Sequence, residues 1–138
     1  MISTRGRYSL RIMLDIACNS STGYVPMRDV AKRQGISLKY IERLMPALRT
    51  AKLVESCHGA GGGYRLTRAP GEYTLWEILE CAEGDLAPVA CLQKDAERCE
   101  RAEGCRTLPV WKGFYDMTRE YFSGMTLADL TADVIEDL

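Results

Sequence analysis

The strongest constraint on the fold is a pair of short amphipathic helices joined by a very tight turn. Pro26 has a fixed φ that suits the first turn of a helix, and Gly35 stops that helix after Gln34. Ser37 is a favourable N-cap, so a second helix begins two residues after Gly35. Its apolar residues recur at helical spacing and are Leu38, Ile41, Leu44, Met45 and Leu48. Two helices joined this tightly must cross steeply, as in a helix-turn-helix.

A small hairpin and a long helix follow this pair. The predicted elements are helices over 8–19, 26–34 and 37–48, strands over 53–57 and 63–67, and helices over 74–84, 106–122 and 126–138. Thr74 and Glu77 fit a capping box, Pro46 should kink or shorten its helix, and residues 85–104 lack periodicity and should form a loop. We therefore expect a mainly α fold with a small β-hairpin, in the order of a winged helix-turn-helix domain followed by a long helix.

Composition excludes several classes of protein. The 138 residues are 46% hydrophobic and 27% charged, which is close to the globular average and excludes an intrinsically disordered chain. A run of about eighteen apolar residues, which a membrane helix needs, is absent. The N-terminal segment has no secretory signal, so we expect a cytoplasmic protein without membrane association.

Charge divides the chain into two unlike parts. Residues 1–75 hold twelve Lys and Arg against five Asp and Glu, whereas residues 76–138 hold six against fourteen. The basic part indicates a surface for a polyanion, because neutralising phosphates dominates the affinity for nucleic acid. Chance segregation of charge on a solvated surface is the weaker explanation.

The second helix of the pair carries outward polar residues near its start. Arg43 can donate to guanine O6 and N7, Glu42 can accept from cytosine N4, and Lys39 suits a phosphate. An ordinary exposed helix face is the alternative. The candidate DNA-contacting residues of the whole chain are Arg28, Ser37, Lys39, Tyr40, Glu42, Arg43, His58, Gly61 and Arg65.

The glycine-rich segment between the two strands does not fit a nucleotide-binding loop. Tyr64 stands where the third glycine of GxGxxG belongs, and the segment leads into a strand rather than a helix. Flanked by His58, Arg65 and Arg68, the tip suits a wing that lies against the minor groove. A plain flexible hairpin is the alternative.

Three of the six cysteines, Cys91, Cys99 and Cys105, fall within fifteen residues. Structural zinc sites usually begin with cysteines two to four residues apart and have four ligands, and neither condition is met here. Three thiolates on a flexible loop can hold an iron-sulfur cluster in which one iron has a weaker ligand. A redox thiol pair or simple buried cysteines fit this spacing nearly as well.

Several segments together resemble a known family. They are Gly6-Arg7-Tyr8, Ile36-Ser37-Leu38 with Tyr40 and Glu42, Gly61-Gly62-Gly63-Tyr64 and the three-cysteine loop. Over residues 2–132 the chain resembles the iron-sulfur cluster regulators of the Rrf2 superfamily, bacterial winged-helix repressors that also include nitric-oxide-sensing and cysteine-metabolism members. The resemblance implies a winged DNA-binding domain over 1–83, a cluster-binding loop over 84–105, and a dimerisation helix with a C-terminal helix over 106–138.

The resemblance also implies partners and ligands. The protein would be a homodimer on a pseudo-palindromic double-stranded DNA operator, with a [2Fe-2S] or [4Fe-4S] cluster on Cys91, Cys99 and Cys105. A fourth ligand does not carry over. The histidine of one branch is replaced by Leu108 and the N-terminal aspartate of another by Tyr8. The open candidates are Cys81, Asp85, a small thiol or solvent; Cys18 and Cys57 are expected as small core or strand residues.

The sequence thus predicts a transcriptional repressor that senses iron-sulfur status, oxidant or nitric oxide through a cluster. The alternative within the superfamily is a cluster-free regulator of cysteine or sulfur metabolism that senses through thiols or a partner protein. A thiol redox enzyme is disfavoured, because it needs a CxxC motif or a Cys-His pair and the chain offers only Cys57 beside His58 in the wing. His58 also stands where the family usually has arginine, which should weaken contact with the minor groove.

Overall fold

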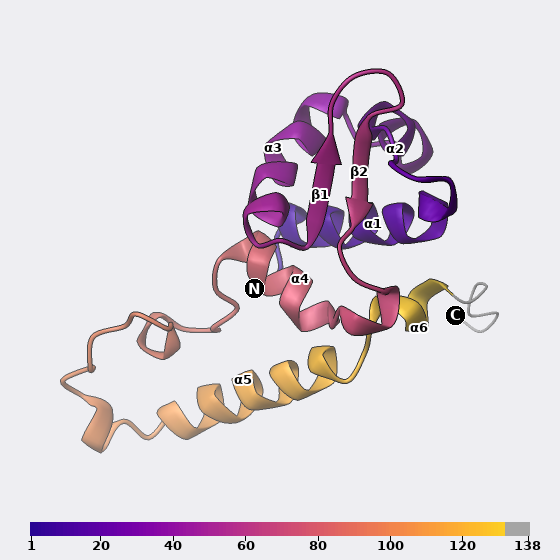
Figure 1. Ribbon diagram of the computed structural model, residues 1–138. Helices are drawn as coiled ribbons and strands as arrows, with labels where there is room; N and C mark the ends of the chain where they lie inside the picture. Colours follow the sequence, from indigo (N-terminus) through magenta and orange to yellow (C-terminus); the bar gives the residue numbers. More distant parts are fainter. Residues whose placement is uncertain (132–138) are drawn as a thin grey trace.

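Two structural parts are visible in the protein, a winged domain and an arm that extends from it (Figure 1). The structure is a computed structural model and describes residues 1–131. The helices are α1 (Thr4–Asn19), α2 (Met27–Gln34), α3 (Leu38–Thr50), α4 (Leu75–Glu83), α5 (Leu108–Ser123) and α6 (Leu127–Thr131), and the strands are β1 (Val54–Cys57) and β2 (Gly63–Leu66). We call α1 to α4 with the hairpin and α6 the winged domain, and residues 84–123 the arm. The predicted fold class, mainly helical with one small hairpin, is confirmed.

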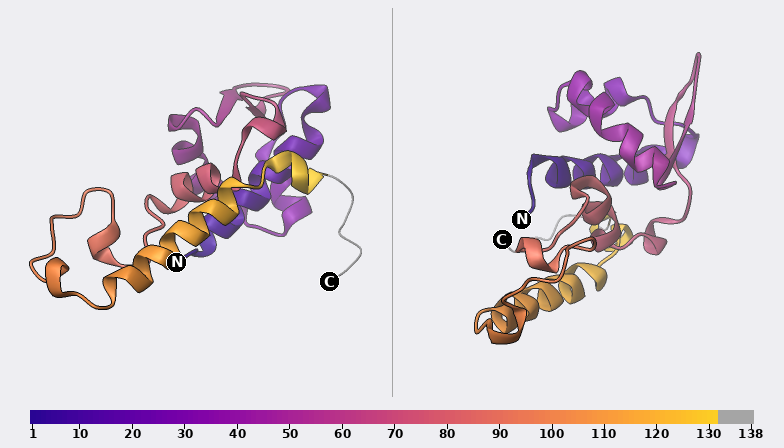
Figure 2. Two further views of the ribbon diagram at one scale, coloured as in Figure 1. Left: turned by 90° about the horizontal axis from the view of Figure 1, so that it is seen from below. Right: turned by 90° about the vertical axis from the view of Figure 1, so that its left-hand side faces the viewer.

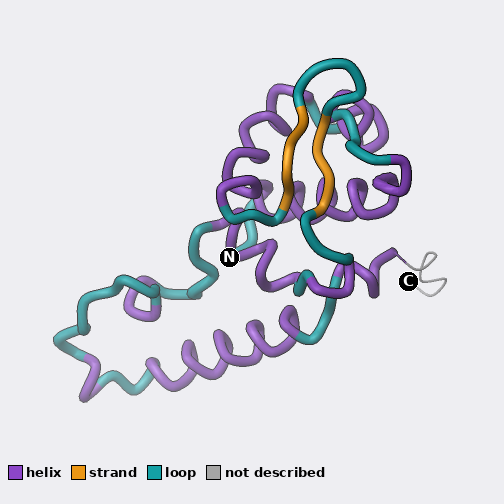
Figure 3. Tube along the Cα trace, viewed as in Figure 1, coloured by secondary structure: helices purple, strands orange, loops and turns teal. Residues whose placement is uncertain are grey.

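The tight turn between α2 and α3 forms as the sequence predicts (Figure 3). Gly35 has a φ of 63°, a left-handed conformation that glycine adopts without steric cost. The Ser37 hydroxyl oxygen accepts a hydrogen bond from the amide nitrogen of Tyr40 at 3.2 Å and so caps α3. Pro46 does not end this helix, which continues to Thr50.

Two local predictions need correction. The first helix begins at Thr4 and not at residue 8, because Ser3 caps it by accepting from the Arg5 amide at 3.1 Å, while the polar residues that follow give no apolar periodicity. Thr74 caps α4 as predicted, but the reciprocal half of the capping box is missing. Glu77 instead accepts a hydrogen bond from Arg68 at 2.7 Å.

The wing is attached to the rest of the domain at several points. β1 and β2 are antiparallel, with Val54 opposite Leu66. Val25, which precedes α2, exchanges two backbone hydrogen bonds with Tyr64 of β2, at 2.7 and 2.9 Å. At the base of the hairpin the fully buried Tyr73 donates its hydroxyl proton to the Leu53 carbonyl at 2.7 Å and accepts from the Thr67 amide at 2.9 Å. These bonds fix the wing relative to α2 and α3.

One hydrophobic core lies between the helices of the winged domain. Its fully buried side chains are Ile12, Met13, Ile16, Val30, Ile41, Leu48, Tyr73, Ile78 and Leu127. The presence of Leu127 shows that the chain returns to this core after the arm, and the Leu127 amide donates to the Tyr73 carbonyl at 3.0 Å. α6 is the described part of the predicted C-terminal helix, and residues 132–138 lie outside the described range.

The arm rests on the winged domain through a smaller apolar cluster. Its members are Trp76 and Leu79 of α4, Leu86, and Tyr115 and Phe122 of α5. The loop before α5 and the first turns of α5 extend away from the winged domain in all views (Figures 1 and 2). Within residues 1–131, no helix has the length and hydrophobicity needed to cross a membrane.

Candidate nucleic-acid interface and cysteine pocket

α3 has one buried side and one exposed side. Ile41 is fully buried in the core and orients the helix. Lys39, Glu42 and Arg43 are exposed on the opposite side, as the sequence predicts. Because Ser37 caps this helix, the exposed groups lie in its first two turns, where a helix end can approach base edges.

Tyr40 differs from the other residues of this surface because it is half-buried. Its ring lies edge-on to that of Tyr8 in α1, with the ring centroids 5.6 Å apart. The guanidinium of Arg11 lies 5.3 Å from the Tyr8 ring centroid, and that of Arg7 lies 5.8 Å away. Tyr40 therefore joins α3 to a basic part of α1.

Arg7 and Arg11 were missed by the sequence reasoning. Both are exposed, and their spacing of four residues within a helix places them on one face. Arg11 donates to both the carbonyl and the side-chain oxygen of Gln34, the last residue before the turn into α3. The i, i+4 pair of arginines was the available signal, and it extends the basic surface beyond α3.

The wing and α3 enclose a groove of about 480 Å³. It brings together four of the predicted DNA-contacting residues, namely Arg28, Glu42, His58 and Gly61. Arg65 is placed differently, because it forms an ion pair with Glu55 and its guanidinium lies 4.6 Å from the Tyr24 ring centroid. The structure thus gathers the wing tip, α2 and α3 around one groove, with Arg65 held by its own neighbours on the hairpin.

An ion pair between the buried Asp15 and the exposed Arg33 links α1 to α2. The Asp15 carboxylate is 3% exposed and accepts hydrogen bonds from Arg33 Nη2 at 2.6 Å and from Gln34 Nε2 at 2.8 Å. Asn19 donates to the Asp15 carbonyl at 2.8 Å. Since α2 leads directly into the turn, this pair sets the orientation of α3.

The cysteine loop brings its three thiols to a common pocket at the start of α5. Cys91, Cys99 and Cys105 all line a cavity of about 150 Å³. The other lining residues are Leu92, Arg98, Ala102 and Leu108. The Arg98 guanidinium is paired with the Glu103 carboxylate at 2.8 Å. Within residues 1–131, no three or more His, Cys, Asp or Glu side chains are arranged to hold a single metal ion.

Cys105 lies where a thiolate is stabilised. The Thr107 hydroxyl lies 3.5 Å from its sulfur, and this hydrogen bond, with those of the Thr107 and Leu108 amides, lowers the pKa of the Cys105 thiol below its ordinary value. The two amides lie at the N-terminal end of α5, where unpaired N–H groups favour an anion. These contacts favour Cys105 as a ligand, because metals bind the thiolate.

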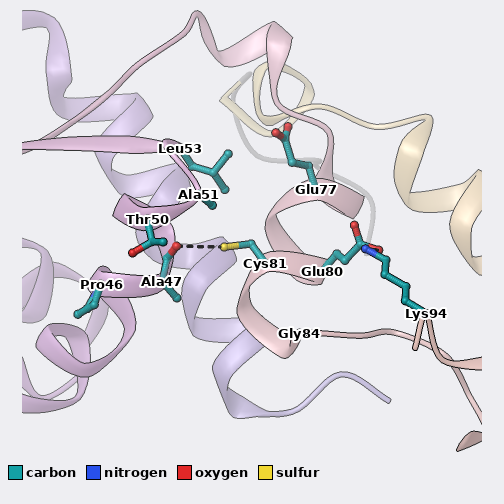
Figure 4. A pocket seen from close by; sticks show the side chains of 10 residues that line it. All are labelled: Pro46, Ala47, Thr50, Ala51, Leu53, Glu77, Glu80, Cys81, Gly84 and Lys94. Atoms are coloured by element: carbon teal, nitrogen blue, oxygen red, sulfur yellow. Dashed lines mark hydrogen bonds and ion pairs between the residues drawn. The ribbon is translucent and has the colours of Figure 1, made fainter. Parts of the chain in front are cut away.

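The candidates for a fourth ligand are not in this pocket. Cys81 lines a separate pocket between α3 and α4, where its sulfur lies 3.5 Å from the Ala47 carbonyl oxygen and burial raises the pKa of its thiol (Figure 4). Asp85 accepts from the backbone amides of Ala87 and Lys94 at 2.7 and 2.9 Å. Leu108 lines the cysteine pocket and supplies no ligand atom.

The two remaining cysteines lie elsewhere. Cys57 is the last residue of β1, as expected for a strand cysteine, and it is exposed. Cys18 is exposed on α1, so the expectation that it is a core or strand residue is wrong. Its helix turns this position outward from the core.

The fold and the basic surface define a class, the winged-helix DNA-binding proteins, here with a cysteine pocket on an arm. Residues 2–133 match the Rrf2 family, described as an iron-dependent transcriptional regulator. Over 129 residues the chain is 36% identical to the HTH-type transcriptional regulator IscR of Enterobacter sp. (strain 638), covering 94% of this chain and 78% of that protein. The chain therefore belongs to the Rrf2 family of transcriptional regulators, and the resemblance seen in the sequence is confirmed.

Solved structures show the same fold. CymR, the global cysteine regulator of B. subtilis, superposes with a TM-score of 0.78 and 34% identity, covering 97% of this chain and 98% of that one. IscR of T. potens superposes with a TM-score of 0.76 and 32% identity, covering 96% of this chain and 87% of that one. The chain is thus similar to both named types of regulator.

Proposed function

We propose that this protein is a homodimeric transcriptional repressor in the cytoplasm, in which an iron-sulfur cluster on the arm changes the affinity of the winged domain for DNA. The observation that carries the proposal is that Cys91, Cys99 and Cys105 line one pocket, apart from the basic surface. In this proposal the winged domain binds DNA and the arm senses the signal.

α3 would lie in the major groove of a double-stranded operator. Arg43 would contact guanine, Glu42 cytosine, and Lys39 a phosphate, while Ser37 and Tyr40 lie at the same end of α3. The wing would reach the adjacent minor groove. There Arg28, His58 and Gly61 line the groove beside α3, and Arg65 approaches from the hairpin. His58 contributes less charge than an arginine would.

The exposed face of α5 supports a homodimer. Val110, Trp111, Phe114, Met117 and Tyr121 are all more than 40% exposed, and their spacing places them along one side of the helix. Monomeric proteins rarely expose so large an apolar patch. A second copy of α5 would cover it and place the two winged domains on the two half-sites of an operator.

The donor set fits a cluster with an incomplete set of protein ligands. Cys91, Cys99 and Cys105 would hold it, and local hydrogen bonds lower the pKa of the Cys105 thiol. Clusters of either type are usually held by four thiolates, so three leave one iron open to solvent or a small molecule. When bound, such a group supplies a centre that oxidants and nitric oxide can attack.

The arm contacts the winged domain at two places, and through them a change in the cysteine loop would reach the DNA-binding surface. Lys94, three residues after Cys91, pairs through its ammonium group with Glu80 of α4 at 2.9 Å (Figure 4). Beyond the pocket, Tyr115 and Phe122 of α5 pack on Trp76 and Leu79 of α4. A change in the loop therefore alters contacts made by α4, a helix of the winged domain.

The test is an anaerobic absorption spectrum with iron and sulfide analysis, on the same sample whose DNA affinity is measured before and after exposure to air or nitric oxide. Visible absorption, bound iron and a change in affinity are expected. Cys91→Ser, Cys99→Ser and Cys105→Ser should each lose most of the iron, whereas Cys18→Ser, a matched exposed cysteine, should keep it. Protein with no iron and no visible absorption contradicts the cluster.

The likeness to CymR favours a second candidate function. CymR is described as a global cysteine regulator, so a regulator of cysteine or sulfur metabolism that senses through its thiols or a partner protein fits the same fold. Such a protein would bind DNA without iron. Its affinity would change on oxidation of the three thiols or on addition of a partner, and the iron analysis above separates the two candidates.

A further inference from the structure

The place where the arm leaves the winged domain carries an unexpected set of contacts. The Glu83 side chain, at the end of α4, is 5% exposed. Its Oε1 atom accepts from the Ser3 amide at 2.6 Å and from the Gly6 amide at 3.0 Å, and the Ser3 hydroxyl lies within 2.9 Å of both carboxylate oxygens. Arg5 Nη2 lies 3.9 Å from Oε2. The carboxylate therefore accepts from two amides at the N-terminal end of α1, where an anion is most favoured.

Gly6 is matched to this carboxylate. A Cβ atom built at Gly6 would lie 2.5 Å from Glu83 Oε1, closer than real Cβ contacts allow. The residue is buried, so a larger side chain there would displace the Glu83 carboxylate or the start of α1. The same Oε1 atom accepts from the Gly6 amide at 3.0 Å, so the close approach and the hydrogen bond belong to one contact.

A second carboxylate orders the cysteine loop two residues further on. Asp85 Oδ1 accepts from the Ala87 amide at 2.7 Å and Oδ2 from the Lys94 amide at 2.9 Å. Gly84, between the two acids, has a φ of 82°, which side-chain-bearing residues rarely adopt. A three-residue stem thus contacts the start of α1 at one end and the loop that carries Cys91 at the other.

We propose that Glu83 is a positioning residue for DNA binding, and that the stem Glu83–Gly84–Asp85 transmits the state of the cysteine loop to α1. The proposal rests on the proposed function and specifies its route. From the start of α1 the path continues to Arg11, which contacts Gln34 just before the turn into α3. A shift of the stem would therefore move the basic residues of α1 together with α3.

The first experiment uses the protein without iron. Hydrogen exchange of the amides in residues 3–10 is measured for the unaltered protein, for Asp85→Asn and for Asp116→Asn, a matched exposed carboxylate on α5. Asp85→Asn should speed exchange in this segment, and Asp116→Asn should not. Exchange at the unaltered rate in Asp85→Asn overturns the inference, whatever the cluster does.

The second experiment measures the ratio of DNA affinities with and without the cluster. The protein is reconstituted with ferrous iron and sulfide, and the probe is a duplex selected in vitro for binding to this protein. Glu83→Gln and Asp85→Asn should bring the ratio toward unity by about twofold to thirtyfold, while Asp116→Asn should keep it. A ratio unchanged in both stem variants overturns the inference. If the ratio is unity in the unaltered protein but Asp85→Asn still speeds hydrogen exchange in residues 3–10, cluster sensing is contradicted. The connection between the stem and α1 then still stands.

A double-mutant cycle tests the steric match. Introduced alone, Gly6→Ala should weaken DNA binding and lower thermal stability, because it displaces the Glu83 carboxylate. In a Glu83→Ala background the same change should have little further effect. Full additivity of the two changes contradicts the match between Gly6 and Glu83.

Discussion

The winged domain and the arm are stabilised in different ways. The winged domain buries a continuous apolar core to which α1, α2, α3, α4 and α6 all contribute. In the arm, Leu86 is the one buried residue, and α5 leaves most of its large apolar side chains exposed. The winged domain thus has a complete core within one chain, whereas the arm leaves an apolar face of α5 uncovered within the chain.

The largest expected effect that separates the two parts is that of salt. DNA binding by a dimer with Arg7, Arg11, Lys39 and Arg43 on each subunit should weaken about a thousandfold between 50 and 200 mM salt, because phosphate contacts release counterions. Iron content should not change over this range. Fluorescence anisotropy with a labelled duplex measures the first quantity, and a flat salt profile would count against DNA binding through this surface.

A truncation in each part sharpens the comparison. Ile41→Ala, in the core, should lower the free energy of unfolding by about 2–5 kcal/mol, since it leaves a cavity. Met117→Ala, at a position 62% exposed on α5, should change the stability of the monomer by less than about 0.5 kcal/mol and weaken self-association instead. Urea unfolding at low concentration and sedimentation equilibrium give the two values, and equal losses of stability would contradict the division.

Two ion pairs allow a charge-matched comparison. Asp15→Asn should lower the free energy of unfolding by about 1–3 kcal/mol, because the buried carboxylate binds Arg33 at 2.6 Å. Asp116→Asn removes an exposed pair with Lys112 at 3.8 Å and should cost at most about 0.5 kcal/mol. Thermal unfolding followed by circular dichroism compares the two losses of stability. A larger loss in Asp116→Asn than in Asp15→Asn would contradict the view that the winged domain is held more firmly than the arm.

The smallest expected effect concerns acid at the junction of the two parts. Burial raises the pKa of the Glu83 carboxyl, but hydrogen bonds from Ser3 and Gly6 and the charge of Arg5 outweigh it, so the pKa is lowered in the folded state. The resulting stabilisation is complete above the ordinary Glu pKa of about 4.3 and is lost as pH falls through the lower folded value.

Glu83→Gln should therefore make the decline in stability below about pH 4.3 shallower. Unfolding midpoints measured at a series of pH values, with Glu72→Gln as an exposed control on the same chain, test this. A decline as steep as in the unaltered protein would show that Glu83 does not titrate as its contacts indicate.

The winged domain could largely be predicted from the sequence because local signals specify it. Gly35 and Ser37 mark the turn, and the apolar period identifies the buried side of α3. The start of α1 was missed because its cap, Ser3, is followed by polar residues and Gly6. The role of Gly6 depends on Glu83, 77 positions away, and no local pattern reveals such a contact.

The candidate site was less predictable. The spacing of Cys91, Cys99 and Cys105 left zinc, cluster and thiol chemistry open, and only the resemblance to a family favoured one of them. Their approach to a common pocket is a property of the folded loop. The basic surface was half predicted: the sequence identified the residues of α3, and the spacing of Arg7 and Arg11 puts them on one face of α1, but their position beside α3 depends on how the two helices pack.

The return of the chain to the core has a consequence for how such regulators diversify. The arm departs at Gly84, and the chain re-enters the winged domain where Thr126 pairs with Thr74. Both attachment points lie in the winged domain, so the arm is an insertion between two fixed points of that domain. The arm can therefore become longer or shorter during evolution, or come to respond to another signal, while the winged domain keeps its fold.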